Sequence, residues 1–399
     1  MVRQRPTRRE YLTMGGAVTV SGLLAGCSGG DSTPTGDGSS SETTTGTATA
    51  GSDGSYTVSM APMGAVTFDA VPETVFTRLT HLAGMAFALG KGNDVTAMHA
   101  PGYYDALWNQ FTPQLPGVKL DWSGRYSSWE PSKEKLYELD SDVHLADPAS
   151  VAATGWSRDD LEEVATNVGP WFGNQYSDTH ATPPDGWADQ YEYYDLWTMF
   201  EKVAAVFREE ARYESLAAIH DDLLGTIEDG LPSSSRRPTV TLAGMTDVEA
   251  PYVYKTDQPG ILSSHVRPLG ARGAFGDDTE SGAQVDLEAM LEADPDVILA
   301  LGGMHPDTDV VAIRENLAEH PVGAELTAVQ NDRVYAQGAR YQGPILNLFQ
   351  LEMTAKQIYP EVFGEWPTYE SGSYPEIPRD EQLFDREQVA SVIVDGADA

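Results

Sequence analysis

Aromatic and arginine side chains gather in the segments that follow the short apolar runs of this chain. Arginine donates a fixed fork of hydrogen bonds to carboxylate or catecholate-like oxygens, and aromatic rings cover the apolar body of a ligand. Acidic residues outnumber basic ones by 61 to 25, so arginines concentrated in these segments predict an anionic ligand. The candidate ligand-binding residues are Tyr103, Tyr104, Trp108, Arg125, Tyr126, Trp129, Trp171, Tyr252, Tyr254, His265, Arg267, Arg272, Arg340 and Tyr341.

Cysteine and histidine are too sparse or too scattered to define a resident metal site. Cys27 is the only cysteine, which excludes an internal disulfide and a cysteine cluster. A bare Zn²⁺ or Mn²⁺ ion needs three or four converging histidine and carboxylate ligands. His81 and His99 each follow an apolar run, so a site with two histidines remains an alternative. No metal ligand is assigned.

Sequence signatures of common enzymes are missing. The chain contains no G-x-S-x-G elbow, no P-loop, no H-E-x-x-H pair and no G-x-G-x-x-G turn. A catalytic pair of carboxylates cannot be chosen among 61 acids. No catalytic residue is assigned, and a secreted hydrolase is the alternative from another class of function.

The formal net charge of −36 limits the partners of the protein. It excludes general nucleic-acid binding and disfavours adhesion to anionic lipid through protein charge, since both partners are polyanions. Arginine outnumbers lysine by 18 to 7, and an acidic, lysine-poor surface is typical of proteins in concentrated salt, which screens the repulsion. With 8 Trp, 18 Tyr and 11 Phe, the chain has the apolar rings of a folded protein.

The first 55 residues have the pattern of an export signal and a tether. Residues 1–26 join a basic start to an apolar run of eleven residues, too short for a membrane span, which needs about 20. The pair Arg8-Arg9 predicts the twin-arginine route, and the residues before Cys27 resemble a lipobox, which predicts cleavage there and lipidation of the thiol. Serine, threonine and glycine make up 21 of residues 28–55, so 27–55 is predicted to be a lipidated, flexible tether. The expected location is extracytoplasmic, with the lipid as the only membrane attachment.

Beyond the tether, short apolar runs alternate with helical patterns, which is typical of an α/β fold. The predicted strands are 74–78, 95–98, 118–122 and 143–146, then 239–243, 297–301 and 333–336. The predicted helices are 80–90, 133–141, 286–293, 308–318 and 342–358. In such sheets a ligand lies at the carboxyl ends of the strands, here between the two halves of the chain.

A longer helical pattern separates these two halves. Apolar residues recur every three or four positions from Leu196 to Ile227, and neither proline nor glycine interrupts residues 191–224. One amphipathic helix of roughly 50 Å is expected; two helices with an unmarked break are the alternative. The predicted domains are an N-terminal lobe, an interlobe helix, a C-terminal lobe and a C-terminal extension, over residues 56–188, 189–230, 231–365 and 366–399.

Two short segments repeat one pattern in the two halves. Residues 134–143 read EKLYELDSDV, and residues 288–297 read EAMLEADPDV. In each, a glutamate at the start of a helix lies eight residues before the aspartate that precedes an apolar strand. The pattern indicates two lobes of like design.

These residues resemble the class III solute-binding proteins of ABC importers, the group that delivers ferric siderophores, haem and cobalamin. The resemblance covers roughly residues 65–365. Its motifs are Val71-Pro72-Glu73-Thr74-Val75, Asp294-Pro295-Asp296-Val297-Ile298 and residues 329–335, reading VQNDRVY. Asp140-Ser141-Asp142 departs from the usual Lys-Pro-Asp, and residues 366–399 have no counterpart.

The resemblance implies two Rossmann-like lobes joined by a single long interlobe helix, which limits lobe movement. It implies a monomer that captures a ferric siderophore or similar iron chelate and delivers it to the permease, with haem, cobalamin or a bare metal ion as alternatives. Glu134 and Glu288 match the glutamates that dock on arginines of the permease. Iron is expected only inside the bound chelate, without a resident cofactor and without covalent chemistry.

Overall fold

The first half of the chain builds a four-stranded parallel sheet. A computed structural model describes residues 49–50 and 54–396; the predicted signal peptide, Cys27 and most of the predicted tether lie outside the described residues. The strands follow the order β6 (Tyr126–Ser127), β5 (Val95–Met98), β4 (Val75–Thr77) and β7 (Val143–Leu145). Every neighbouring pair is parallel, so the carboxyl ends of all four strands meet at one edge.

The second half builds a larger sheet. Its strands follow the order β11 (Ala283–Gln284), β9 (Tyr252–Tyr254), β8 (Thr239–Gly244), β12 (Val297–Ala300) and β13 (Val334–Ala336), and β10 (Arg272–Gly273) also pairs with β8. The central strands β8, β12 and β13 are parallel, whereas β9 runs antiparallel to β8. The α/β fold class is confirmed.

One predicted strand, 118–122, does not form, although these residues lie within the described range. Side chains bond the backbone groups that a neighbouring strand would otherwise use. Asp105 Oδ1 accepts the backbone N–H of Trp122 at 2.6 Å, and Asn109 Nδ2 donates to the carbonyl of Leu120 at 3.3 Å. The edge strand is instead β6, four residues later.

An antiparallel sheet at the start of the described chain has no counterpart among the predicted strands. Strands β2 (Tyr56–Met60) and β3 (Gly64–Phe68) form a hairpin, and β1 (Thr49–Ala50) pairs with β2. Alternate residues of β2 are buried, and β2 packs on helix α6. The segment predicted to be a tether therefore contains a short strand, which needs only backbone pairing.

Helices cover both sheets. The first half contains α1 (Thr80–Ala88), α2 (Pro101–Trp108), α3 (Lys133–Leu139), α4 (Pro148–Ala152) and α5 (Arg158–Asn167). The second half contains α8 (Leu287–Ala293), α9 (Val310–Glu319), α10 (Thr327–Gln330), α11 (Pro344–Ile358), α12 (Pro360–Phe363) and α13 (Arg386–Asp395). No helix in the described part of the chain is both long and apolar enough to cross a membrane.

Helices α1 and α11 join the two halves into one apolar core. Every residue of both helices is buried, and the helices pack on each other. The backbones approach closely at Gly84 and Gly343: a Cβ added to Gly343 would lie 2.8 Å from the Cα of Gly84. Glycine is required there because any side chain would separate the two halves.

The prediction of one long interlobe helix is wrong. The segment forms two helices, α6 (Leu196–Phe207) and α7 (Glu210–Gly230), which fold back on each other, so that Phe200 packs on Tyr213 and Trp197 on His220. Both helices turn an apolar stripe toward the same core, which is why the periodicity continues across the break. The break lies at Arg208, with φ of 54°, where the guanidinium carbon lies 4.3 Å from the centre of the Tyr56 ring.

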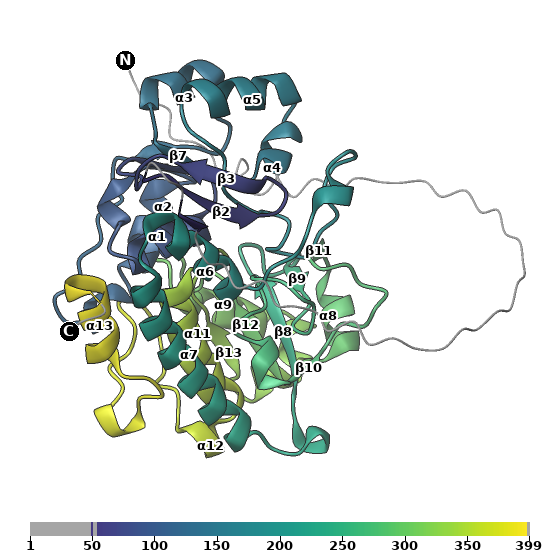
Figure 1. Cartoon of the computed structure of the whole chain (residues 1–399). Coiled ribbons are helices and arrows are strands. Elements are labelled where there is room, and N and C mark those ends of the chain that lie inside the picture. The colour runs from purple at the N-terminus through teal and green to yellow at the C-terminus, as the bar shows by residue number, and fades with distance from the viewer. Residues whose placement is uncertain (1–48, 51–53, 397–399) are drawn as a thin grey trace, which may run out of the picture. The chain divides into compact units, whose positions relative to one another are not determined.

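Residues 366–395, part of the predicted C-terminal extension, pack into the core. Tyr374 is fully buried; its N–H donates to the carbonyl of Gln110 at 2.7 Å, and its carbonyl accepts from Gln114 Nε2 at 3.0 Å. Helix α13, in yellow, lies against α7 (Figure 1). The segment therefore links the second half of the chain back to the first.

Candidate functional site

An aromatic–arginine cluster lies where the strands of both sheets end. We define it by the residues Arg78, His81, His99, Tyr103, Tyr104, Trp129, Asp178, Tyr254, His305, Arg340 and Tyr341. Arg78 directly follows β4 and His99 directly follows β5, whereas His305 and Arg340 come from the loops after β12 and β13. Because the carboxyl ends of parallel strands share an edge, residues far apart in sequence meet here.

Aromatic rings from the two halves interlock within the cluster. Tyr103 of α2 stacks on His305, with ring centres 4.0 Å apart and planes 7° apart. The ring centres of Tyr104 and Tyr341 lie 6.1 Å apart, and those of His99 and Trp129 lie 4.5 Å apart. Two surface hollows, beside Ile393 and beside His320, lie elsewhere and are lined by other residues. The contacts of Tyr103 with His305 and of Tyr104 with Tyr341 place these rings at the junction between the two halves.

Arg78 is a buried cation without a matching anion. Only 4% of its surface is exposed, and no carboxylate of the described residues lies within ion-pair distance of it. Its Nε donates to the carbonyl of Trp129 at 3.1 Å, and its Nη1 donates to Ser150 Oγ at 2.8 Å and to Gln175 Oε1 at 3.2 Å. Burial lowers the pKa of Arg78. Asp147 and Glu130 favour its charge only from beyond ion-pair distance, and a buried charge without a direct ion pair is costly, so this guanidinium favours an anionic ligand.

Arg340 has an anionic neighbour, but the contact is long. Its Nη2 lies 3.7 Å from Asp178 Oδ2, and its guanidinium faces the rings of Tyr254 and Tyr341 at 5.5 and 5.1 Å. Arg340 Nε and Asp178 Oδ1 are both buried, and neither has a hydrogen-bond partner among the described residues. Burial raises the pKa of Asp178 to about 6, although Arg340 opposes the shift.

The histidines of the cluster are neutral at pH 7. Burial lowers the pKa of His81 to about 3, and burial, together with Arg78 and Arg340, lowers that of His99 to about 4. The ring centres of His81 and His99 lie 6.3 and 6.4 Å from the ring centre of Tyr341. Within the described ranges no group of three or more His, Cys, Asp or Glu side chains could hold a metal ion. The alternative of a two-histidine metal site therefore lacks a third ligand there.

The structure brings six of the fourteen predicted ligand-binding residues into the cluster, namely Tyr103, Tyr104, Trp129, Tyr254, Arg340 and Tyr341. Three others are buried among core side chains. Trp108 packs on Phe87, Trp171 donates from Nε1 to the carbonyl of Leu161, and His265 contacts Gln342 through Nδ1. These three side chains pack in the core. An aromatic residue close to an apolar run can belong to the core as readily as to a binding site.

The remaining five predicted residues make local contacts away from the cluster. Arg267 donates to the carbonyls of Gln258 and Gly260, and Arg272 donates to the carbonyl of Arg237. Arg125 reaches the carbonyl of Asn93 at 3.5 Å, the ring of Tyr126 lies under Lys135, and Tyr252 pairs with Gly244 and Gln284 in the second sheet. Each arginine completes a turn or a strand end.

Arg78, Asp178 and His305 were missed by sequence reasoning. Arg78 was detectable, because it is the last residue of the predicted strand 74–78 and so lies at a carboxyl end. Asp178 carried no signal among 61 acids. His305 follows a predicted strand but had no neighbour of related chemistry in the sequence, since its partner Tyr103 comes from the other half.

Glu134 and Glu288 occupy equivalent places in the two halves. Each is exposed in the first turn of a seven-residue helix, α3 or α8, which ends at an aspartate with positive φ. In both, the aspartate before the next strand accepts a backbone N–H from the neighbouring strand: Asp142 from Thr74 at 2.8 Å and Asp296 from Thr239 at 2.7 Å. The ten-residue pattern is therefore a repeat in the structure.

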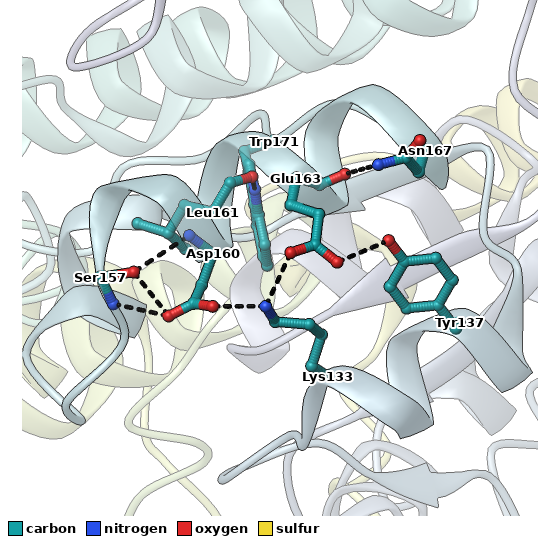
Figure 2. Close-up of polar contacts among 8 residues, drawn as sticks. All are labelled: Lys133, Tyr137, Ser157, Asp160, Leu161, Glu163, Asn167 and Trp171. Carbon is teal, nitrogen blue, oxygen red and sulfur yellow. Dashed lines mark hydrogen bonds and ion pairs between the residues drawn. The ribbon is translucent and has the colours of Figure 1, made fainter.

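A polar network surrounds the start of α3 (Figure 2). Lys133 bonds Asp160, and its Nζ also donates to Glu163 Oε2 at 2.9 Å; Tyr137 donates to Glu163 Oε1 at 3.1 Å. The hydrogen bond from Lys133 lowers the pKa of Asp160 to about 2. Lys133, which precedes Glu134 in the sequence, is thus paired with two carboxylates of α5.

A family model for periplasmic binding proteins matches residues 127–341, more than half of the chain. The chain therefore belongs to the periplasmic binding protein family, and membership implies an extracytoplasmic location. The family resemblance drawn from the sequence is confirmed. A search of curated proteins finds no match.

Solved structures of periplasmic binding proteins share the fold. A periplasmic binding protein from Veillonella parvula aligns with a TM-score of 0.55 at 14% identity, over 76% of this chain and 90% of that one. CeuE from Helicobacter pylori, with Ni(II) bound, aligns with a TM-score of 0.54 at 14% identity, over 77% and 90%. FeuA from Bacillus subtilis, a triscatecholate siderophore binding protein complexed with ferri-bacillibactin, aligns with a TM-score of 0.51 at 14% identity, over 76% and 97%.

Proposed function

We propose that this protein is the substrate-binding component of an ABC importer and captures a ferric siderophore or similar anionic iron chelate. The family supplies the general role of a binding protein. The observation that carries the choice of ligand is the aromatic–arginine cluster, which combines the uncompensated Arg78, the loosely paired Arg340 and rings from both halves. Guanidinium groups suit the anionic oxygens of a chelate, and the rings suit its body.

Iron would enter and leave as part of the chelate. The chelate supplies the metal ligands, so the protein needs no resident cofactor and performs no covalent step. A bulky guest requires Tyr103 and His305 to separate, because their stacked rings close the junction between the two halves. The contacts of Tyr341 with His81, His99 and Tyr104 would also have to adjust, and we expect only modest movement of the two halves.

Delivery would use the two repeated helices. Glu134 and Glu288, one in each half, would pair with arginines of the permease subunits, so that both halves of one monomer are engaged together. Exposed ion pairs contribute little affinity but fix orientation and speed association. Lipidation of Cys27 after export would keep the protein beside its permease.

Tryptophan fluorescence tests this function, since Trp129 lies in the cluster. The protein in molar KCl is titrated with ferric tris-catecholate, ferrioxamine, haemin, cobalamin, Zn²⁺ and Mn²⁺. Ferric tris-catecholate should bind most tightly, and Arg78→Gln should weaken it about tenfold or more. Arg272→Gln is the control, because Arg272 is exposed and lies outside the cluster.

Three outcomes would contradict the proposal. Preference for haemin or cobalamin would transfer the function to those ligands, and stoichiometric Zn²⁺ or Mn²⁺ would indicate a metal-ion receptor. A product detected by mass spectrometry after incubation with any chelate would indicate an enzyme. Circular dichroism of Arg78→Gln checks that the variant is folded.

A further inference from the structure

Asp178 is held rigidly beside Arg340 by the opposite half of the chain. The carbonyls of Ser177 and Asp178 accept the N–H groups of Ile261 and Leu262 at 3.2 and 3.0 Å. Gly260, with φ of 137°, allows this approach, since a Cβ there would lie 2.6 Å from the Asp178 carbonyl oxygen. These bonds fix the backbone at Asp178, and the residue is only 4% exposed.

The Asp178–Arg340 pair, in which the Arg340 side chain is 38% exposed, is looser than a fully buried pair in the same chain. Arg386 and Glu352 approach to 2.7 Å, and both Glu352 oxygens accept hydrogen bonds. Asp178 and Arg340 are 3.7 Å apart, and within the described chain Asp178 Oδ1 and Arg340 Nε lack a partner. Arg386 Nε lacks one as well, so the two pairs differ in their distance and in the unpaired oxygen of Asp178. Buried polar atoms are normally satisfied, so an unpaired carboxylate oxygen beside an arginine indicates a ligand that offers a donor next to an anionic group.

The surrounding charges define what that ligand can carry. Arg78 and Arg340 are the cations of the cluster, and Asp178 is its carboxylate; nearby Asp147 is already bonded to Tyr191 and two backbone N–H groups. Tyr254 of β9 faces the Arg340 guanidinium, and Tyr104 of α2 also interacts with it. An approaching anionic oxygen is attracted by the arginines, whereas a second acceptor placed at Asp178 would be repelled.

We propose that Asp178 is a specificity residue that selects chelates carrying a hydrogen-bond donor, an amide N–H or hydroxyl, beside an anionic oxygen. The anionic oxygen would bond Arg340 Nε, and the donor would bond Asp178 Oδ1. Chelates with acceptors alone would leave Asp178 unpaired and be discriminated against by the buried carboxylate. This inference rests on the proposed binding of chelates at the cluster and adds the feature that distinguishes one anionic chelate from another.

Two ferric complexes of equal charge test the selection. Ferric tris-catecholate presents acceptors only, whereas the tris complex of 2,3-dihydroxybenzamide adds an amide with a free N–H. In molar KCl at pH 8 with excess ligand, the wild-type protein should bind the benzamide complex about tenfold more tightly. Asp178→Asn should bind the catecholate complex about tenfold better than wild type and change benzamide binding less than threefold. Asp257→Asn, which removes an exposed carboxylate, should retain the wild-type preference.

The outcomes separate this inference from the proposed function. Equal wild-type affinity for the two complexes, measured without any variant, overturns the selection by Asp178 and leaves chelate binding standing. An unchanged preference in folded Asp178→Asn does the same. Failure of the wild-type protein to bind either complex overturns both proposals.

Discussion

Arg386 Nη2 lies 2.7 Å from Glu352 Oε1, and the two side chains are only 5% and 0% exposed. Tyr374 Oη and the Leu383 N–H also donate to Glu352, at 2.8 and 2.7 Å, so its carboxylate is satisfied on both oxygens. Arg386 Nη1 donates to Gln114 Oε1 at 2.7 Å. The C-terminal segment thus ties α11 of the second half to the first half through one buried ion pair.

Breaking this pair from one side should destabilise the protein strongly. Arg386→Met leaves the Glu352 carboxylate buried without its cation, so we expect a loss of about 3–5 kcal/mol in the free energy of unfolding, measured by urea titration in molar KCl. Arg379→Met is the matched control, because Arg379 and Glu387 form an exposed pair with side chains 73% and 65% exposed. That variant should lose less than about 1 kcal/mol; equal losses would contradict the assignment.

The break between α6 and α7 can be tested at Arg208. Its φ of 54° is costly for β-branched residues, so Arg208→Val should destabilise the protein by about 1–2 kcal/mol or more, whereas Arg208→Gly should be better tolerated. Urea unfolding measures both. Glu214→Val, at an exposed position in the regular part of α7, introduces a β-branched residue without a positive φ and is the control. A continuous helix would reverse the order, with glycine more harmful than valine.

The repeated glutamates make a sharp test of docking. The double variant Glu134→Ala, Glu288→Ala should bind ferric chelate like the wild type but lose most chelate uptake, measured in cells or in proteoliposomes containing the permease. Glu138 and Glu292 hold the next matching positions of the two repeats, and both are exposed. Alanine at both of these positions should therefore preserve uptake. Uptake that survives the first double variant excludes the docking assignment.

Buried neutral histidines should make the protein less stable in acid. Burial lowers the pKa of His81 from about 6.5 to about 3, so the unfolded chain binds a proton between those values that the folded chain does not. The stability present above pH 6.5 is therefore lost as the pH falls toward 3, by about 2 kcal/mol between pH 7 and pH 5. His81→Leu should show that much less pH dependence in urea unfolding.

Asp147 and Asp178 change the pH dependence of stability in the opposite direction to His81. Burial raises the pKa of each to about 6, so the folded chain binds their protons first and gains stability as the pH falls from above 6 toward 4. Both aspartates are present in the wild type and in His81→Leu, and the difference between the two proteins isolates the histidine. An identical pH profile for both would contradict a buried, neutral His81.

Most of the regular elements and the repeat follow from local sequence patterns. Strands such as Val95–Met98 and helices such as Lys133–Leu139 form where periodicity and capping residues predict them, because these signals depend on neighbours a few residues away. The equivalence of Glu134 and Glu288 was likewise visible, because each lies in a short pattern that carries its own helix start and strand start.

The place where the chain folds back and the set of residues that meet at the cluster depend on long-range packing. At the turn, Arg208 lies against the ring of Tyr56, a contact between residues far apart in the sequence that no local signal marks. Arg78, Asp178 and Arg340 come from segments up to 262 residues apart, and their burial and incomplete pairing exist only after both sheets are assembled. Their chemistry depends on desolvation and distance, which a linear order of residues does not contain.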